Sequence, residues 1–150
     1  MNIQIRKLNS DEIASALKLT LEVFMEFEAP DYSQEGVEEF QRFLNNQPEI
    51  DKLHFFGALY QDSLSGIIAM RNDHICLLFV KKEFHRKGIA KALFRHILEQ
   101  TQSEKITVNS SPYATEIYKR LGFTATNTEQ ITNGIRYTPM VFTANPKNKG

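Results

Sequence analysis

The chain has 150 residues, of which 41% are hydrophobic and 11% aromatic, so it is long and apolar enough to fold as one domain and is too apolar for a disordered protein. Its 18 basic and 18 acidic residues give a formal net charge of zero, which argues against a dedicated nucleic-acid-binding protein, because such proteins carry a basic excess. The single cysteine excludes an internal disulfide framework and a thiolate-based zinc site, and it fits a reducing compartment.

Membrane and export signals are not evident in the sequence. Residues 1–7 lack the apolar core of a signal peptide. The longest apolar stretch, Ile75 to Val80, is far shorter than the ~20 residues that a membrane-spanning helix needs. We therefore expect a cytoplasmic protein without a membrane partner.

The zero net charge hides an uneven distribution of charged residues. Residues 9–51 carry eleven acids and two bases, a local net charge of −9. Residues 81–96 carry six bases and one acid, a local net charge of +5. This asymmetry is more informative about function than the average.

Hydrophobic periodicity and turn residues predict the elements of the chain. In chain order they are a strand at 2–7, a helix from Asn9 to a break at 29–31, a helix from Ser33 to near Pro48, strands at 53–60, 66–71 and 75–80, a helix at 87–102, a strand at 105–109, a helix at 112–121, and strands at 123–132 and 135–143. The apolar residues of the first helix recur at helical spacing at Ile13, Leu17, Leu21 and Phe24.

Caps and turns mark the boundaries in the C-terminal half. Ser111 before Pro112 predicts a helix cap followed by a proline at the first helical position, and Gly122 can end that helix. Asn133-Gly134 is the strongest short hairpin signal in the chain. Pro139 indicates an edge or a bulge in the last strand, because proline has no backbone N–H to donate.

The resulting order, βααβββαβαββ, predicts a single α+β domain over residues 1–150, with a mixed sheet flanked by helices. The strands at 75–80 and 105–109, with the helix between them, have the length of a right-handed parallel crossover. The remaining strands are expected to be mostly antiparallel. Residues 145–150 are expected to form a frayed tail.

The segment 85–90, His-Arg-Lys-Gly-Ile-Ala, stands between a strand and a strongly periodic helix. Gly88 and Ala90 lack bulk, so backbone N–H groups of the first helical turn can approach a ligand closely. These unpaired N–H groups and the helix dipole favour an anion such as a pyrophosphate. Lys87 and Lys91 lie one turn apart and can add charge-assisted contacts. The alternative is an ordinary helix start with solvated basic side chains.

A second segment, residues 109–123, leaves the next strand and opens another helix. Tyr118 lies one position beyond Ile117, which belongs to the apolar stripe of this helix. Its hydroxyl can therefore reach the edge of a cleft, and a tyrosine packed in the core is the alternative. The segment ends in Leu-Gly-Phe at positions 121–123.

In this order and separation, the two segments resemble the GCN5-related N-acetyltransferase (GNAT) superfamily. In that family Arg/Gln-x-x-Gly-x-Gly/Ala receives the pyrophosphate of coenzyme A, and a later helix carries a Tyr before a Leu-Gly-Phe stop. Residues 85–90 match the first pattern except that His85 replaces Arg or Gln. Tyr118 with residues 121–123 matches the second. The likeness covers residues 2–143 and implies a GNAT-like fold whose parallel strands at 75–80 and 105–109 splay apart.

The resemblance implies an acetyl-CoA-dependent N-acetyltransferase that uses no metal and transfers the acetyl group directly to an amine. Tyr118 would then be the general acid toward the departing thiolate. A backbone N–H near Phe79 would stabilise the developing oxyanion. Many family members have Asn where this chain has Ser111, so Ser111 and Asn109 are both candidates for contacting the pantetheine. The implied coenzyme-binding residues are Leu78, Phe79, Val80, His85, Arg86, Lys87, Gly88, Ile89, Ala90, Lys91, Asn109 and Ser111.

The general base is not fixed by the sequence. An aliphatic amine is mostly protonated at pH 7, so a base or a water relay is needed. Glu28 and Asp31 are candidates, because the broken segment between the first two helices lines the acceptor side in the family. His54 and His74 are weaker candidates. Cys76 lies in an apolar strand and is interpreted as a core residue rather than a nucleophile.

The acceptor is expected to be a small cationic amine. The acidic segment 9–51 can attract a cation into a cleft, although charged outer helix faces are the alternative explanation. The predicted substrate-binding residues are Phe27, Asp31 and Tyr32.

Two other functions remain open. One is acetylation of a peptide or protein N-terminus, which predicts an open acceptor groove. The other is a non-catalytic acyl-CoA-binding or sensing module, in which Tyr118 is dispensable. The expected partners are acetyl-CoA and an amine acceptor, with no nucleic acid and no membrane. The resemblance also leaves a homodimer open, because dimers are common in the family.

Overall fold

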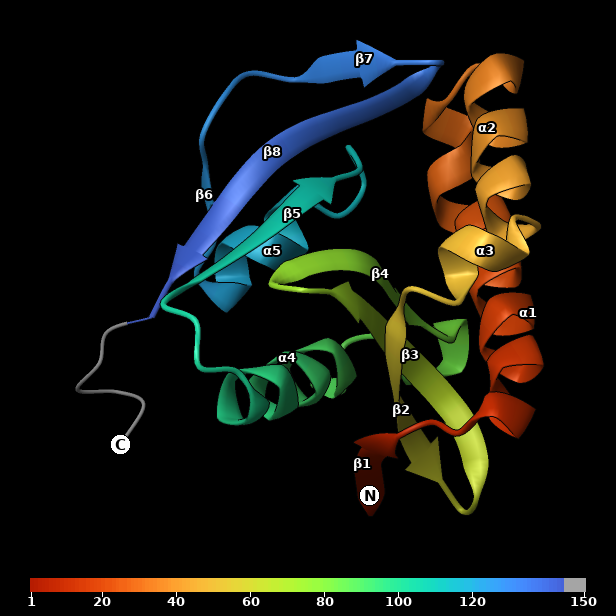
Figure 1. The fold of residues 1–150 in the computed structure, drawn as a ribbon, viewed down its shortest axis with the longest axis vertical. Helices are drawn as coiled ribbons and strands as arrows, with labels where there is room; N and C mark the ends of the chain where they lie inside the picture. Colours follow the sequence, from red (N-terminus) through yellow and green to blue (C-terminus); the bar gives the residue numbers. More distant parts are fainter. Residues whose placement is uncertain (145–150) are drawn as a thin grey trace.

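A sheet of eight strands runs through the computed structural model, which describes residues 1–144 (Figure 1). The strands are β1 (Ile3–Lys7), β2 (His54–Tyr60), β3 (Ser63–Arg71), β4 (His74–Val80), β5 (Lys105–Ser110), β6 (Thr124–Ala125), β7 (Gln130–Thr132) and β8 (Ile135–Thr143). Their order in the sheet is β1-β2-β3-β4-β5-β8-β6, and β7 pairs with β8. The tail predicted at 145–150 lies outside the described residues.

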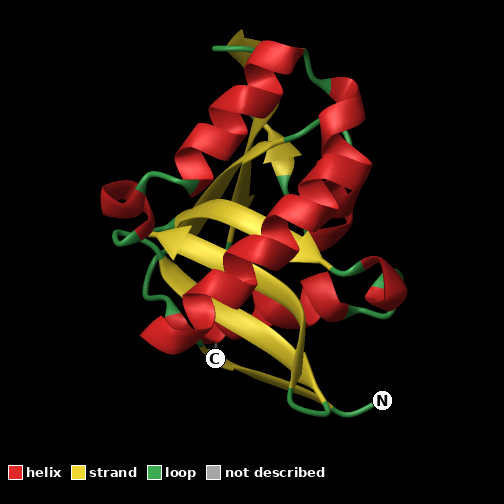
Figure 2. Cartoon of the chain, turned by 90° about the vertical axis from the view of Figure 1, so that its right-hand side faces the viewer, coloured by secondary structure: helices red, strands yellow, loops and turns green. Residues whose placement is uncertain are grey.

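The helices lie on both faces of this sheet. They are α1 (Ile13–Val23), α2 (Gln34–Leu44), α3 (Gln47–Ile50), α4 (Ile89–Gln100) and α5 (Thr115–Leu121). Helices α1 and α2 cross one face (Figure 2), whereas α4 and α5 lie on the other (Figure 1). Only the β4–β5 pair is parallel among the described pairs of strands. The predicted α+β fold with a mixed, mostly antiparallel sheet is confirmed.

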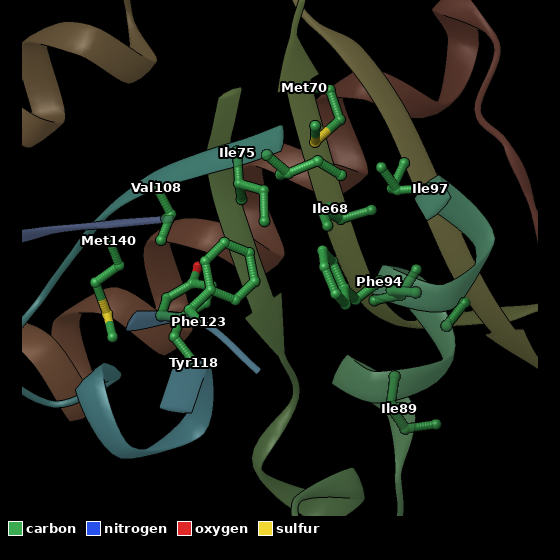
Figure 3. Close-up of a cluster of buried hydrophobic side chains, with 13 residues drawn as sticks. Ile68, Met70, Ile75, Ile89, Phe94, Ile97, Val108, Tyr118, Phe123 and Met140 are labelled. Atoms are coloured by element: carbon green, nitrogen blue, oxygen red, sulfur yellow. The ribbon is translucent and has the colours of Figure 1, made fainter. Parts of the chain in front are cut away.

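Each face of the sheet has its own hydrophobic core. Ile68, Met70 and Ile75 of the sheet pack with α4, α5 and the segment that follows α5, as Figure 3 shows. On the opposite face, Leu77 and Phe79 pack with α1 and α2. Strands buried on both faces explain why residues 66–70 and 75–80, on either side of the polar turn between β3 and β4, are continuously apolar.

The N-terminal helical region differs from the sequence expectation in its buried face. The buried residues of α1 are Ala16, Leu19, Thr20 and Val23, whereas Leu21, which belongs to the predicted stripe, is 36% exposed. A π-helical turn at Phe24–Glu28 and a 3₁₀ turn at Ala29–Asp31 follow α1. Such turns rotate the side chains that follow, so helical spacing does not carry through them.

The C-terminal half differs from expectation at three places. Helix α5 begins at Thr115, because Ser111 closes a turn over residues 112–114, in which its hydroxyl accepts the Ala114 N–H at 3.2 Å. The predicted strand 123–132 is split into β6 and β7. The last strand is not an edge strand, since β8 lies between β5 and β6. At Pro139, however, only β5 pairs with β8, because β6 pairs with Met140 and Val141 and β7 pairs with residues 135–137, so the proline lies at a local gap in the pairing.

The β7–β8 hairpin is fixed against the start of α2 by a close backbone contact. A Cβ added to Gly36 would lie 2.2 Å from the Gly134 carbonyl oxygen, and one added to Gly134 would lie 2.4 Å from the Gly36 nitrogen. Gly134 also has a φ of +81°, as its position in the turn requires. The Tyr32 hydroxyl donates to the Arg136 carbonyl, and Arg136 donates to the Asp31 carbonyl. The hairpin and α2 therefore hold one another in place.

Gly36→Ala tests this contact. The added methyl group meets backbone atoms that cannot rotate away, so we expect a loss of about 1–3 kcal/mol in the free energy of unfolding, measured by urea denaturation. Glu35→Ala, at the exposed neighbouring position, is the matched control and should change stability by less than about 0.5 kcal/mol. Equal stabilities of the two variants would contradict the close docking of hairpin and helix.

Candidate active site

The parallel pairing of β4 with β5 is limited to the first two residues of β4, which lie opposite the middle of β5. His74 is opposite Thr107 and Ile75 is opposite Val108, and no pair follows within the described strands. In the pairing of β3 with β4, Ala69 lies opposite Leu77 and Met70 lies opposite Ile75. Cys76 is therefore an extra residue of β4, a β-bulge. A bulge bends its strand and increases its twist. The bulge thus accounts for the divergence of β4 from β5, and it leaves one edge of Leu77 to Val80 unpaired.

A cavity of about 310 Å³ lies at this divergence. Its wall combines the bulged part of β4 and the end of β5 with residues from five other segments of the chain. The lining residues are Phe24, Glu28, Tyr32, Glu39, Phe40, Phe43, His74, Ile75, Cys76, Leu77, Leu78, Phe79, Val108, Asn109, Ser111, Ala114, Tyr118 and Ile135. Among the described residues, no Lys or Arg side chain takes part in lining it, so its charged groups are carboxylates.

Tyr118 of α5 is placed in this cavity. Its ring is 5% exposed and packs edge-on against Phe123, with ring centroids 5.4 Å apart (Figure 3). The hydroxyl has no hydrogen-bond partner among residues 1–144 and is thus available to a ligand. Burial first, and then the charge of Glu28, raise the pKa of Tyr118 above its ordinary value. The phenol therefore stays protonated at physiological pH and can donate.

Glu28 enters the same cavity from the π-helical turn after α1. Desolvation raises the pKa of this carboxyl to about 7, the negative charge of Asp31 adds to the shift, and a hydrogen bond from the Ser111 hydroxyl opposes it. Its charge also raises the pKa of Tyr118 and that of Tyr113, as a secondary cause after burial. A carboxyl with this pKa can accept a proton near neutral pH.

The other base candidates are less suitable. His74 lines the cavity, but its Nδ1 lies 2.8 Å from the Thr107 hydroxyl, and burial lowers its pKa. His54 lies at the start of β2, exposed and 3.4 Å from the Lys7 ammonium, away from the cavity lining. Burial raises the pKa of the Cys76 thiol, so this thiol is poorly activated as a nucleophile, as the sequence analysis expects.

The loop before α4 has the geometry of an anion site. Arg86 and Gly88 have φ values of +63° and +80°, and the helix begins at Ile89 rather than at Lys87. Such left-handed residues turn successive N–H groups toward one side, next to the unpaired N–H groups of the first turn of α4. The side chain of Ile89 is buried, so this residue offers only its backbone to a ligand. Positive charge can come from three exposed side chains, those of Arg86, Lys87 and Lys91. The space beside Gly88 is open, because a Cβ added there would meet no atom within 4 Å beyond its chain neighbours.

His85 occupies the position where the family pattern has Arg or Gln. Its Nε2 lies 2.6 Å from the Val80 carbonyl oxygen, so the ring fastens the loop to the end of β4. Its ring also contacts that of Phe27, with centroids 4.8 Å apart. His85 thus shapes the loop through its side chain.

The residues predicted on the acceptor side differ in their positions relative to the cavity. Tyr32 lines the cavity. Phe27 stays outside the cavity wall and stacks on Tyr113 at 5.4 Å, so it bridges the loops that follow β4 and β5. Asp31 is exposed and contributes its carbonyl to Arg136. Of the pantetheine candidates, Ser111 is buried beside Glu28, whereas Asn109 is exposed along β5.

Several lining residues have no signal in the sequence that assigns them to the site, among them Glu39, Phe40, Phe43 and Ile135. Phe40 recurs with Val37 and Leu44 at helical spacing in the sequence, a pattern that does not distinguish a core residue from a residue that lines a cavity. Glu39 is one of several acids on the same helix. Ile135 follows the hairpin turn, and only the docking of the hairpin brings it to the site.

Two further features of residues 1–144 bear on the expected partners. No group of three or more His, Cys, Asp or Glu side chains in this range is placed to hold a metal ion. No helix within the same range is both long and apolar enough to cross a membrane.

Comparison with known proteins points to one family. A sequence model of the acetyltransferase (GNAT) domain matches residues 28–144. No curated protein sequence gives a significant match.

Solved structures of acetyltransferases share the fold. A GCN5-related N-acetyltransferase from Rhodopseudomonas palustris superposes with a TM-score of 0.83 at 18% identity, over 95% of this chain and 96% of that one. PaiA N-acetyltransferase from Thermoplasma acidophilum, solved in complex with coenzyme A, gives 0.76 at 21% identity, over 95% and 99%. An aminoglycoside 6′-N-acetyltransferase complexed with coenzyme A gives 0.65 at 14% identity, over 95% and 98%.

The raised pKa of Glu28 predicts a gain in stability for Glu28→Gln. A carboxyl whose folded pKa of about 7 exceeds its ordinary value of 4.5 binds its proton more tightly in the folded state, so the wild type loses stability as pH rises through this window. We expect the variant to unfold like the wild type at pH 4.5 and to be about 1–3 kcal/mol more stable at pH 8. Urea unfolding at both pH values measures this, and a variant that is destabilised at pH 8 would refute the assignment.

Proposed function

We propose that this chain, which belongs to the acetyltransferase (GNAT) family and is an N-acetyltransferase, acts on a small cationic molecule. It transfers the acetyl group of acetyl-CoA directly to a primary amine of that molecule. The proposal depends on one observation: Glu28 and Tyr118 line the same cavity. Glu28 has a pKa of about 7, and the Tyr118 hydroxyl has no hydrogen-bond partner among the described residues. One group can take a proton from the acceptor, and the other can give a proton to the leaving group.

The residues present fit acetyl-CoA, which supplies the acetyl group as an activated thioester. The edge of β4 at Leu78 to Val80, which pairs with no strand, offers backbone groups to a pantetheine arm in the manner of an added strand, apart from the Val80 carbonyl, which His85 contacts. The free N–H groups at the start of α4, with Arg86, Lys87 and Lys91, suit a pyrophosphate. Both lie on the same side of the divergence, at the carboxyl end of β4.

The proton transfers follow from the two groups in the cavity. Glu28 removes a proton from the ammonium group of the acceptor, and the neutral amine then forms the new C–N bond. As the C–S bond breaks, Tyr118 donates its proton to the departing sulfur, and the second proton on the amide nitrogen returns to the Tyr118 oxygen. The net result is an acetamide, a free thiol and a proton left on Glu28. A backbone N–H near Phe79 stabilises the oxyanion that develops on the carbonyl.

The shape and the charge of the site support a small cationic acceptor. The β7–β8 hairpin is docked on α2 and Ile135 closes part of the cavity, an arrangement that leaves less room for an extended peptide than an open groove does. Glu28 and Glu39 line the cavity, and the one base paired with them among the described residues, Arg42 at Glu39, lies outside the lining, so a positive charge is favoured in the cavity.

Incubation of the protein with acetyl-CoA and a panel of amines, followed by free thiol release, tests the proposal. We expect turnover with small amines, and Tyr118→Phe should lower kcat by about 10²–10⁴-fold with little change in the dissociation constant for CoA, because only the proton donor is lost. Tyr60→Phe, in which the ring that packs against Phe84 is kept, is the matched control. Tight CoA binding without turnover of any amine would indicate a sensing module instead.

The pH dependence of kcat/KM tests the base. In the wild type we expect activity to fall as pH drops below about 7, because Glu28 becomes protonated and can no longer accept the proton of the amine. In Glu28→Gln the fall in activity near pH 7 should be absent, because the carboxyl group is missing, and kcat/KM should be low. Activity should then rise only at the higher pH at which the free amine itself loses its proton. An unchanged acid limb in the variant would move the role of base to another group.

A further inference from the structure

A second cavity of about 330 Å³ adjoins the first one on the side of the β7–β8 hairpin. Tyr32, Glu39, Asn109 and Ile135 line both cavities, so the two spaces share one boundary. The mechanism described above uses only the first cavity, which contains Glu28 and Tyr118. The second one extends the site away from the reacting groups.

Glu39 lies at the shared boundary and is the charged side chain of the second lining. Its Oε2 accepts a hydrogen bond from Arg42 at 2.8 Å, whereas its Oε1 has no partner among the described residues. Arg42 is 66% exposed, so water screens this ion pair, and a ligand ammonium group can compete with Arg42 for Glu39. One oxygen of Glu39 is thus left for a ligand.

The first cavity, which both Glu28 and Glu39 line, also has many apolar side chains in its wall. Phe24, Phe40 and Leu78 belong to the first cavity, together with the ring of Tyr32, which stacks on Phe24 with centroids 5.6 Å apart. A ligand that reaches from Glu28 to Glu39 therefore passes along hydrophobic side chains, where methylene groups are better accommodated than polar ones.

We propose that the second cavity is an acceptor subsite and that the preferred acceptor is a diamine, with its reacting amine at Glu28, an apolar spacer along the aromatic wall, and its second ammonium group at Glu39. This inference rests on the proposed N-acetyltransferase function and specifies its substrate class. Glu39 is a specificity-determining residue in this arrangement and takes no part in the proton transfers.

Paired substrates test the inference. Aliphatic diamines from diaminopropane to diaminooctane are compared, each with the monoamine of the same chain length, by kcat/KM in the thiol-release assay. The wild type should prefer a diamine of one optimal length over its monoamine by roughly five- to tenfold, as expected for one half-exposed ion pair. Glu39→Gln should remove that preference through KM, and it should raise the KM of the diamine by a larger factor than the KM of the monoamine, because only the diamine places an ammonium group at Glu39.

Two further variants sharpen the test. Glu38→Gln, which removes a charge from the neighbouring position on α2, should keep the preference and thus serves as the matched control. Arg42→Gln releases Glu39 from its ion pair and should increase the preference for the diamine. Thermal melting confirms that each variant is folded.

The outcomes separate this inference from the proposed function. Equal losses for monoamine and diamine in Glu39→Gln, or an equal effect of Glu38→Gln, would overturn the role of Glu39. A wild type that acetylates monoamines as well as diamines, at every length, would overturn the subsite and leave the N-acetyltransferase proposal intact. A wild type that acetylates no amine would overturn the proposed function itself.

Discussion

The bulge at Cys76 is the constraint on which the rest of the site depends. It ends the pairing of β4 with β5 after two residue pairs, and it changes which face of the sheet the following side chains occupy. Ile75 before the bulge packs on the α4 side, whereas Leu77 after it packs on the side of α1 and α2. One extra residue thus opens a cavity through the sheet, leaves a strand edge free, and lets both layers of helices contribute side chains to one space.

The two chemical groups reach that space from opposite faces. Glu28 comes from the turn after α1, and Tyr118 from α5, on the other side of the sheet. Each lies where burial favours the neutral form, and Glu28 further raises the pKa of Tyr118. Burial therefore prepares both functions, since it makes the carboxyl a base near neutral pH and keeps the phenol protonated.

The opposed charges of the chain also have separate places in the fold. Lys82 and Glu26 join the basic and acidic segments in one exposed ion pair at 3.1 Å. Beyond this contact, Arg86, Lys87 and Lys91 surround the start of α4, while Glu28 and Glu39 line the cavity. Several other acidic residues of the segment 9–51 lie on outer helix faces. Only part of the negative charge of this segment therefore acts in the cavity.

The sequence by itself determined the order of the main elements and the glycine-containing loop before α4, because these depend on local periodicity and on residues with special backbone freedom. The resemblance of its motifs to the GNAT superfamily indicated Tyr118 as the residue to test. Only the tertiary structure decided the rest. The start of α5 depends on the hydrogen bond that the Ser111 hydroxyl accepts. The split of β6 from β7 depends on their pairing with different parts of β8, and the buried face of α1 depends on the core that it packs against. Along the chain, Glu28 is one of several candidate bases and Glu39 one of many acids, and only the folding of distant segments around the divergence of β4 and β5 brings them to one cavity. Desolvation and shape arise when distant segments meet, so no pattern along the chain could supply them.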